Sequence, residues 1–258
     1  MSEKSLTSSN LCRQCARSAM CFGSLGGTSS QQLQRSHKVY HRGETLFSMG
    51  DEFAAVYIMR TGSAKSFVST ARGDEQISGF FYKGDMLGAD GFDNMTHGHS
   101  LKFLETSSVC WIGLNELDKA LIESPTKRGQ LLKSMSHALV DEQRMLVNMA
   151  KLSSEQRLAK FLLDLSERFE LQGLCATTFD LSMTRIDIAN FLGMAIETIS
   201  RLLTKLQQQK IIKVNRRQIN LINMDKLQRC LLDEPGNSWT PDCKVQQLKF
   251  QSSSALVA

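Results

Sequence analysis

The feature that most constrains the fold is a pattern of helix, turn and helix within residues 184–203. Thr184 followed three residues later by Asp187 is a helix N-cap signature, and the apolar residues after it continue that helix. Gly193 supplies a sharp turn, and a second helix is expected to begin at about Ile196. The start of this second helix, at Ala195, lacks the usual capping residue, which lowers the stability of the helix by roughly 1 kcal/mol. The pattern predicts a helix-turn-helix unit.

Three polar side chains in the first turns of the second helix have the chemistry of base readers. Glu197 can accept a hydrogen bond from a cytosine amino group, Arg201 can bind guanine O6 and N7, and Ser200 can serve a base or a phosphate. A Glu and an Arg four residues apart also form an ordinary surface salt bridge, so the trio is weak evidence by itself. Within a capped helix, a glycine turn and a basic hairpin, it predicts recognition of the DNA major groove.

Positive charge gathers around this helix, although the whole chain carries a formal net charge of only +5. Residues 198–224 contain six basic residues and no acidic one, namely Arg201, Lys205, Lys210, Lys213, Arg216 and Arg217. Apolar and polar residues alternate over residues 211–222, which predicts a hairpin wing. Such a field is typical of phosphate binding. The expected DNA contacts are Arg185, Glu197, Thr198, Ser200, Arg201, Lys205, Arg216 and Arg217.

The N-terminal half has short β-prone runs punctuated by glycine, from about residue 38 to residue 114. The runs are residues 56–59, 64–68, 76–82, 101–104 and 108–112. Short strands separated by glycine turns predict an antiparallel β-roll or barrel. Together with the C-terminal helices, this predicts an α+β protein.

A long helix is expected between the two halves, opened by Pro125 and running from about residue 126 to residue 151. Its apolar residues follow the alternating three and four spacing of a coiled-coil seam, namely Leu132, Met135, Leu139, Leu146 and Met149. Glu142 occupies the remaining seam position. Two such carboxylates would face each other in a parallel dimer, which would make dimerisation conditional. Alternatively, the helix packs on its own β domain and Glu142 points to water.

Four of the seven cysteines form a candidate metal site: Cys12, Cys15 and Cys21 near the start, and the distant Cys110. The chain shows neither a secretory signal nor a membrane-spanning run, so we expect a cytoplasmic protein. In a reducing compartment, clustered cysteines are more often metal ligands or redox thiols than disulfides. One close pair and two single cysteines fit zinc less well than an iron-sulfur cluster. Cys175, Cys230 and Cys243 show no such grouping.

Composition and punctuation divide the chain into five segments. We expect a cysteine-rich cluster-binding segment at residues 1–27, a β-roll sensor domain at 28–125, a dimerisation helix at 126–152, a winged helix-turn-helix domain at 153–233 and a flexible tail at 234–258. The first segment has little periodic apolar content, so only a ligand could order it well.

Taken together, these motifs resemble the FNR family (fumarate and nitrate reduction regulators) of the cyclic-AMP receptor protein superfamily. The resemblance covers nearly everything from Cys12 to about Leu231. Its strongest blocks are residues 43–47, 73–77, 104–107 with Cys110, and 183–185 through 197–203. It implies a β-roll like that of cyclic-nucleotide-binding domains, a long dimerisation helix with its acidic residue at Glu142, and a winged helix-turn-helix domain.

The resemblance also implies a function, that of a transcription regulator and not of an enzyme. Cys12, Cys15, Cys21 and Cys110 would hold a four-iron four-sulfur (4Fe-4S) cluster that is stable without oxygen and broken down by it. The cluster would promote dimerisation and binding to a TTGAT-N4-ATCAA palindrome in double-stranded DNA, read by the residues matching Glu197, Ser200 and Arg201. RNA polymerase is the further expected partner, and the loops at residues 70–74 and 82–85 are candidate contacts.

Two positions depart from the superfamily's nucleotide-binding pocket. Where a cyclic nucleotide needs a Glu for its ribose and an Arg for its phosphate, this chain has Ala89 and His99. We therefore expect no response to cyclic AMP. The rival interpretation is a thiol- or zinc-based redox regulator of the same fold. An enzyme is disfavoured, because no nucleophile with its base or pair of carboxylates is recognisable.

The substitution Glu142→Ala tests the conditional seam. Without the opposed carboxylates, we expect a dimer that survives loss of the metal, measured by size-exclusion chromatography before and after chelation. An unchanged fraction of monomer would contradict the role assigned to Glu142.

Overall fold

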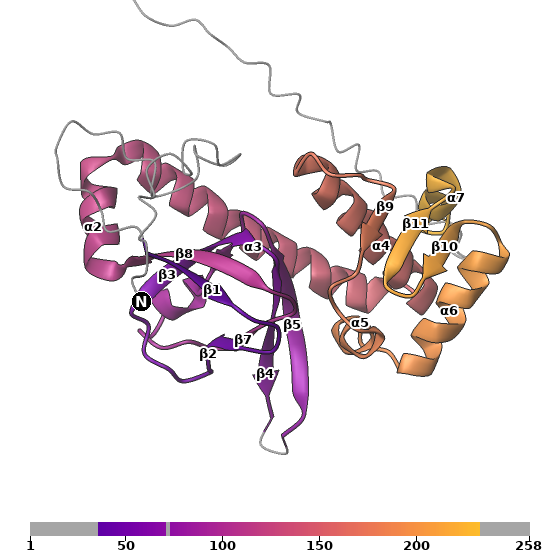
Figure 1. The fold of residues 1–258 in the computed structure, drawn as a ribbon, viewed down its shortest axis with the longest axis horizontal. Coiled ribbons are helices and arrows are strands. Elements are labelled where there is room, and N and C mark those ends of the chain that lie inside the picture. The colour runs from indigo at the N-terminus through magenta and orange to yellow at the C-terminus, as the bar shows by residue number, and fades with distance from the viewer. Residues whose placement is uncertain (1–35, 71–72, 233–258) are drawn as a thin grey trace, which may run out of the picture.

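A computed structural model describes residues 36–70 and 73–232 of the 258-residue chain, and it confirms the predicted α+β fold. Two four-stranded sheets form the N-terminal β-roll, in the strand orders β1-β8-β3-β6 and β2-β7-β4-β5 (Figure 1). All the strand pairs in them are antiparallel. The strands are β1 (Ser36–Tyr40), β2 (Thr45–Phe47), β3 (Ala55–Thr61), β4 (Ser63–Ser69), β5 (Glu75–Tyr82), β6 (Met86–Leu87), β7 (Ser100–Phe103) and β8 (Ser107–Gly113). A short 3-10 turn, η1 (Ala89–Phe92), follows β6.

The five predicted runs correspond to β3, β4, β5, β7 and β8 and are confirmed. The other strands of the roll, β1, β2 and β6, are too short or too polar to show an alternating pattern. Apolar side chains between the sheets form the core of the roll, including Phe47, Met59, Leu101 and Phe103. A sandwich of this kind buries the alternate residues of each strand.

Gly62 makes the tight connection between β3 and β4. Its φ is +85°, in the left-handed region that glycine adopts without strain. A Cβ atom at this position would lie 2.1 Å from Ser107 Oγ and 2.8 Å from Ser107 Cα. The backbones of the β3–β4 turn and β8 can approach this closely only because residue 62 has no side chain.

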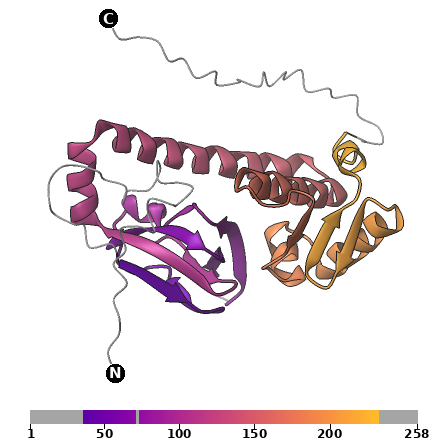
Figure 2. The same ribbon diagram turned by 45° about the horizontal axis from the view of Figure 1, so that its top comes forward.

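Two helices follow the roll and cover the outer face of its first sheet. They are α2 (Leu114–Glu123), which the sequence did not predict, and α3 (Pro125–Lys151), which begins one residue before its predicted start. Leu117 of α2 and Leu131 of α3 pack with Phe53 and Val56 in a separate apolar cluster. The rest of α3 runs on past the roll to the C-terminal domain (Figure 2). Within the described ranges, no helix is long and apolar enough to cross a membrane.

The C-terminal domain contains the predicted helix-turn-helix and wing. Its elements are α4 (Ser154–Leu171), β9 (Thr178–Asp180), α5 (Arg185–Phe191), α6 (Ile196–Gln208), β10 (Ile212–Asn215), β11 (Gln218–Leu221) and α7 (Met224–Arg229). The wing hairpin β10–β11 is confirmed, and β9 extends it into a three-stranded sheet. Leu158, Ile188, Ile199 and Leu206 are buried where the helices meet.

Two glycine substitutions test this packing, because they should change the free energy of unfolding in opposite directions. Gly62→Ala should lower the free energy of unfolding by about 1 to 3 kcal/mol, because its methyl group overlaps Ser107 and its φ is positive. Gly129→Ala, inside α3 with nothing within 4 Å of the added Cβ, should raise it by about 0.5 to 1 kcal/mol. Urea unfolding at one fixed protein concentration measures both. Equal midpoints for Gly62→Ala and the unchanged protein would contradict the close approach.

Candidate nucleic-acid interface

The first helix of the pair, α5, is capped as the sequence predicts. Thr184 Oγ1 accepts a hydrogen bond from the Asp187 N–H at 3.1 Å, and the Asp187 carboxylate accepts one from the Thr184 N–H at 2.8 Å. Gly193, with φ +61°, makes the turn that follows. The second helix, α6, begins after Ala195 with no side-chain cap, which confirms the missing N-cap. Its first N–H groups are therefore open to another acceptor, such as a phosphate.

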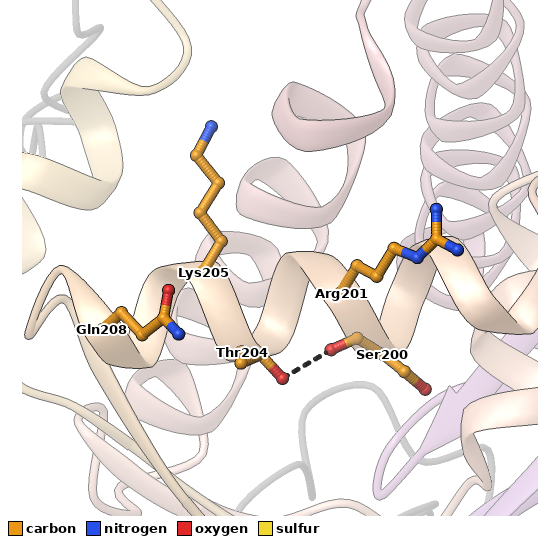
Figure 3. A pocket seen from close by; sticks show the side chains of 5 residues that line it. All are labelled: Ser200, Arg201, Thr204, Lys205 and Gln208. Carbon is orange, nitrogen blue, oxygen red and sulfur yellow. Dashed lines mark hydrogen bonds between the residues drawn. The ribbon is translucent and has the colours of Figure 1, made fainter.

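The outward face of α6 is a stripe of polar side chains at helical spacing. Ile199, Leu203 and Leu206 are buried on the inner face. On the outer face, Ser200, Arg201, Thr204, Lys205 and Gln208 line a hollow of about 320 Å³ (Figure 3). Glu197, also exposed, extends the stripe by one turn, and Thr198 beside it is half-buried. Sequence reasoning missed Thr204 and Gln208, which continue the spacing of three and four residues from Ser200 and Arg201.

Basic side chains of α5 and the wing lie close to one another. Arg185, in the first turn of α5, and the wing residues Arg216 and Arg217 line a second hollow of about 220 Å³. All three arginines are exposed. Lys205 differs, because its Nζ lies 2.6 Å from Glu155 Oε2 of α4. Arg185, Arg216 and Arg217 are thus brought together at one hollow, whereas Lys205 of α6 is held by an acidic partner.

Two basic residues of this domain have backbone angles that ordinarily belong to glycine. Lys210, just after the C-cap of α6, and Arg216, in the two-residue turn of the wing, both have φ +55°. A left-handed conformation costs a residue with a Cβ roughly 1 to 2 kcal/mol. Both side chains are exposed, so packing does not explain the choice of residue. Both strained positions therefore carry an exposed positive charge.

The end of α3 is linked to the helix-turn-helix turn by one arginine. Arg157 Nη1 of α4 donates a 2.7 Å hydrogen bond to the carbonyl oxygen of Leu192, the C-cap of α5. The same atom lies 3.3 Å from Met149 Sδ in α3. A Cβ on Gly193 would contact both side chains. The position of the turn before α6 is therefore tied to the last turns of α3.

The predicted seam of α3 divides into two kinds of residue. Leu132, Leu139 and Leu146 are 60%, 56% and 71% exposed, and Glu142 is exposed beside them. The two methionines of the seam are half-buried: Met135 packs on the α2–α3 cluster and Met149 on the core of the C-terminal domain. The exposed line of leucines recurs every seven residues, as a coiled-coil face requires.

Of the four predicted metal ligands, the described residues include Cys110 alone. Cys12, Cys15 and Cys21 lie outside them, as do residues 1–27 and 234–258. Cys110 is half-buried in β8, opposite Ile58 of β3 and His37 of β1. Ile58 packs in the α2–α3 cluster, so Cys110 lies on the sheet face that these helices cover. No metal-binding group of His, Cys, Asp or Glu is found among residues 36–70 and 73–232.

The chain before β1 is long enough to bring the other thiols to this strand. β1 begins at Ser36, whose register partner is Trp111, the neighbour of Cys110. Cys21 precedes Ser36 by 36 − 21 = 15 residues, an extended reach of about 50 Å. Four cysteine thiolates are a donor set that suits an iron-sulfur cluster. The donor chemistry and the entry point of the chain thus fit such a group.

His99 stands where the family resemblance places the phosphate-binding arginine of a cyclic-nucleotide pocket. Its Nδ1 lies 3.2 Å from Asp90 Oδ2, and burial lowers the pKa of the imidazole. The neighbouring His97 stacks on Phe47, with 3.6 Å between the ring centroids. His99 and Ala89 therefore provide neither the guanidinium fork nor the acceptor of a cyclic-nucleotide site.

Two family models match this chain. The cyclic nucleotide-binding domain matches residues 37–124, and the Crp-like helix-turn-helix domain matches residues 156–230. Among solved structures, FixK2 from Bradyrhizobium japonicum is similar, with a TM-score of 0.71 and 26% identity, covering 77% of this chain and 98% of that one.

Curated proteins are similar over most of their length. The transcriptional activator protein Anr of Pseudomonas protegens is 36% identical over 225 residues, which cover 86% of this chain and 91% of that protein. The fumarate and nitrate reduction regulatory protein of Yersinia pestis is 38% identical over 220 residues, covering 84% and 88%.

Replacing the strained wing residue Arg216 should affect stability and DNA binding in opposite directions. Arg216→Gly should raise the free energy of unfolding by about 0.5 to 1 kcal/mol, since it relieves the left-handed strain but adds freedom to the unfolded chain. It should also weaken DNA binding and reduce the slope of log K against log salt by about one phosphate contact. Chemical unfolding and a salt series of binding isotherms measure the two effects.

Met95 offers a matched control, because its φ is +58° in an exposed loop of the β-roll. Met95→Gly should stabilise the chain similarly and leave the salt slope unchanged. Undiminished DNA affinity in Arg216→Gly would show that the wing arginine does not contact phosphate.

Proposed function

Because the chain belongs to the FNR family of transcription regulators, we propose that it controls transcription in response to oxygen. The proposal assigns three tasks to three parts of the molecule: DNA reading to α6, oxygen response to the four cysteines, and dimerisation to α3. RNA polymerase is the proposed partner at promoters, and the cytoplasm the proposed location.

The observation that carries the proposal is the polar stripe on α6, in a domain whose α5 and wing bring three arginines together. An α-helix fits the major groove, where each base pair presents a distinct pattern of donors and acceptors. Glu197, Ser200 and Arg201 stand in the first two turns, where a recognition helix meets base edges. We assign contacts with the sugar-phosphate backbone to Arg185, Arg216 and Arg217, which line one hollow between α5 and the wing. We propose a TTGAT-N4-ATCAA palindrome as the target.

The sensing part is assigned to Cys110 with Cys12, Cys15 and Cys21. A 4Fe-4S cluster on these thiolates would supply an oxygen-labile cross-link between the N-terminal segment and β8. Cys110 shares its sheet face with Ile58, which packs in the same cluster as Leu131 of α3. A restraint on β8 could therefore reach the first turns of α3 through a single layer of apolar side chains.

Dimerisation is assigned to the exposed leucines of α3. Leu132, Leu139 and Leu146 present an apolar line that a second copy would cover, while Glu142 places like charges in the same line. A palindrome read by two copies requires such a two-fold contact. Repulsion between the carboxylates keeps the contact conditional.

The proposal is tested by purifying the protein without oxygen, measuring its absorption spectrum, iron and acid-labile sulfide, and assaying binding to the palindrome by gel shift before and after exposure to air. We expect about four iron and four sulfide per chain, with bleaching and loss of DNA binding in air. Cys110→Ser should remove the metal and the anaerobic binding. Cys175→Ser, at an exposed cysteine in the loop before β9, is the matched control and should change neither.

The alternative regulator predicts a different result in the same experiment. Zinc, or no metal, with DNA binding indifferent to air would keep the assignment of α6 and reject the oxygen response. Air-sensitive binding without iron would instead favour a thiol-based sensor that uses the same cysteines.

A further inference from the structure

Strand β5 is an edge strand of its sheet, and helix α5 of the DNA-binding domain covers that edge. Asn190 Nδ2 donates a 2.7 Å hydrogen bond to the Glu75 carbonyl, and Asn190 Oδ1 accepts a 2.6 Å bond from the Ile77 N–H. Gln76 Nε2 in turn donates to the Asn190 carbonyl at 3.1 Å. One amide side chain thus satisfies both groups that a neighbouring strand would otherwise pair. This is a directional contact, which fixes the position of α5 along β5.

A buried ion pair reinforces this contact from the adjacent strand. Lys65 Nζ of β4 lies 2.9 Å from Asp187 Oδ1 of α5 and 3.2 Å from Glu75 Oε2. The side chains of Lys65 and Asp187 are each only 12% exposed. Burial alone would raise the pKa of Asp187, but hydrogen bonds from Thr184 and Lys65 outweigh it and lower that pKa. The pair is therefore charged at neutral pH, and removal of Lys65 leaves the Asp187 carboxylate buried with only its hydrogen bonds from Thr184.

Aromatic side chains join the two domains next to these polar contacts. Phe80 of β5 meets Phe191 of α5 edge to face, with 4.9 Å between the ring centroids. Tyr82 meets Phe169 of α4 in the same manner at 6.0 Å. Tyr82 is 7% exposed and belongs to the same apolar cluster as the core of the C-terminal domain. The neighbouring loop is held as well, because Asp85 forms an ion pair with Arg168 of α4.

We propose that the β4–β5 hairpin is a docking site that sets the position of the recognition helix, and that this contact makes the protein selective for the spacing between the two half-sites of its operator. The contact, called the hairpin clamp below, consists of Lys65, Glu75 and Ile77 on the hairpin and Asp187 and Asn190 on α5. The proposal rests on the proposed function, since it concerns the binding of a two-fold DNA site.

The geometry supports a positioning role because the clamp and the DNA-reading stripe use different helices. Clamp contacts lie on α5, whereas Glu197, Arg201 and Lys205 on α6 remain exposed. Backbone continuity between the domains is provided only by Leu152 and Ser153, between α3 and α4. A palindrome demands a fixed separation of two recognition helices. Without the clamp, each DNA-binding domain would lose the amide bridge and the ion pair that hold α5 on the hairpin, and its recognition helix would reach the required position less often.

Two clamp variants of the full-length protein, purified without oxygen, test the proposal. Asn190→Ala removes the amide bridge, and Lys65→Met removes the charge but keeps an apolar stem. The matched controls are Asn94→Ala, which removes an exposed amide that donates to Asp93, and Lys160→Met, which removes an ion pair with Asp164 within α4. For each variant, the dissociation constant is measured on the palindrome and on duplexes with one base pair added to or removed from the spacer. Hydrogen exchange reports the protection of the Ile77 amide.

Both clamp variants should bind the natural spacing about tenfold more weakly, because the apparent Kd rises as the competent arrangement is depopulated. Their preference for the natural spacer over the altered ones should shrink, and in Asn190→Ala the Ile77 amide should exchange faster. Controls should stay within about twofold of the unchanged protein. An unchanged spacing preference in both clamp variants would overturn the proposal. Tighter binding at the natural spacing would also overturn it, because the clamp would then hold the domain away from DNA.

Failure of the proposed function would be recognised separately. If the unchanged protein binds no palindrome, with or without oxygen, the DNA-binding assignment fails and the spacing role fails with it. The docking itself is still decided by exchange of the Ile77 amide, since unchanged protection in Asn190→Ala would show that α5 does not cover the edge of β5.

Discussion

One helix contributes to two separate cores, and the remainder of the structure is arranged around it. The first part of α3 packs on the β-roll through Leu131 and Met135, and its last turns pack on the DNA-binding domain through Met145 and Met149. Residues 136–144, between these two regions, are exposed throughout. An isolated helix with no packed face is only marginally stable in water. The span between the two cores is therefore the part of the fold that gains most from a second copy of the chain.

Local signals in the sequence predicted much of this architecture because they act over three or four residues. Capping of α5 by Thr184 and Asp187, the missing cap at Ala195 and the turn at Gly193 each depend on neighbours in the chain. The glycine breaks located the longer strands for the same reason. In the DNA-binding domain, helical spacing predicted the polar stripe on α6. Thr204 and Gln208 follow the same spacing, although they were not among the predicted DNA contacts.

Contacts between distant residues could not be predicted in this way. The bridge from Asn190 to strand β5 joins residues more than 110 positions apart, and no periodic pattern marks an asparagine for that use. The same holds for the pairing of Lys205 with Glu155, which turns an expected phosphate contact into a partly neutralised one. Helix α2 was overlooked, although Leu114, Leu117 and Leu121 follow helical spacing and pack in one apolar cluster. The roles of the cysteines remain predictions carried by family resemblance.

The register of β8 has a consequence for how ligand chemistry can evolve in such a sheet. Successive residues of a strand point to opposite faces, so Cys110 lies beneath the helices while Val109 and Trp111 belong to the other face, where Val109 is buried in the roll. A slip of one residue would exchange these faces completely. The thiol would then enter the interior of the roll, where no incoming chain could reach it. The register of the strand pairing thus determines which face of the sheet carries the side chain of residue 110, and hence whether its thiol can bind a ligand.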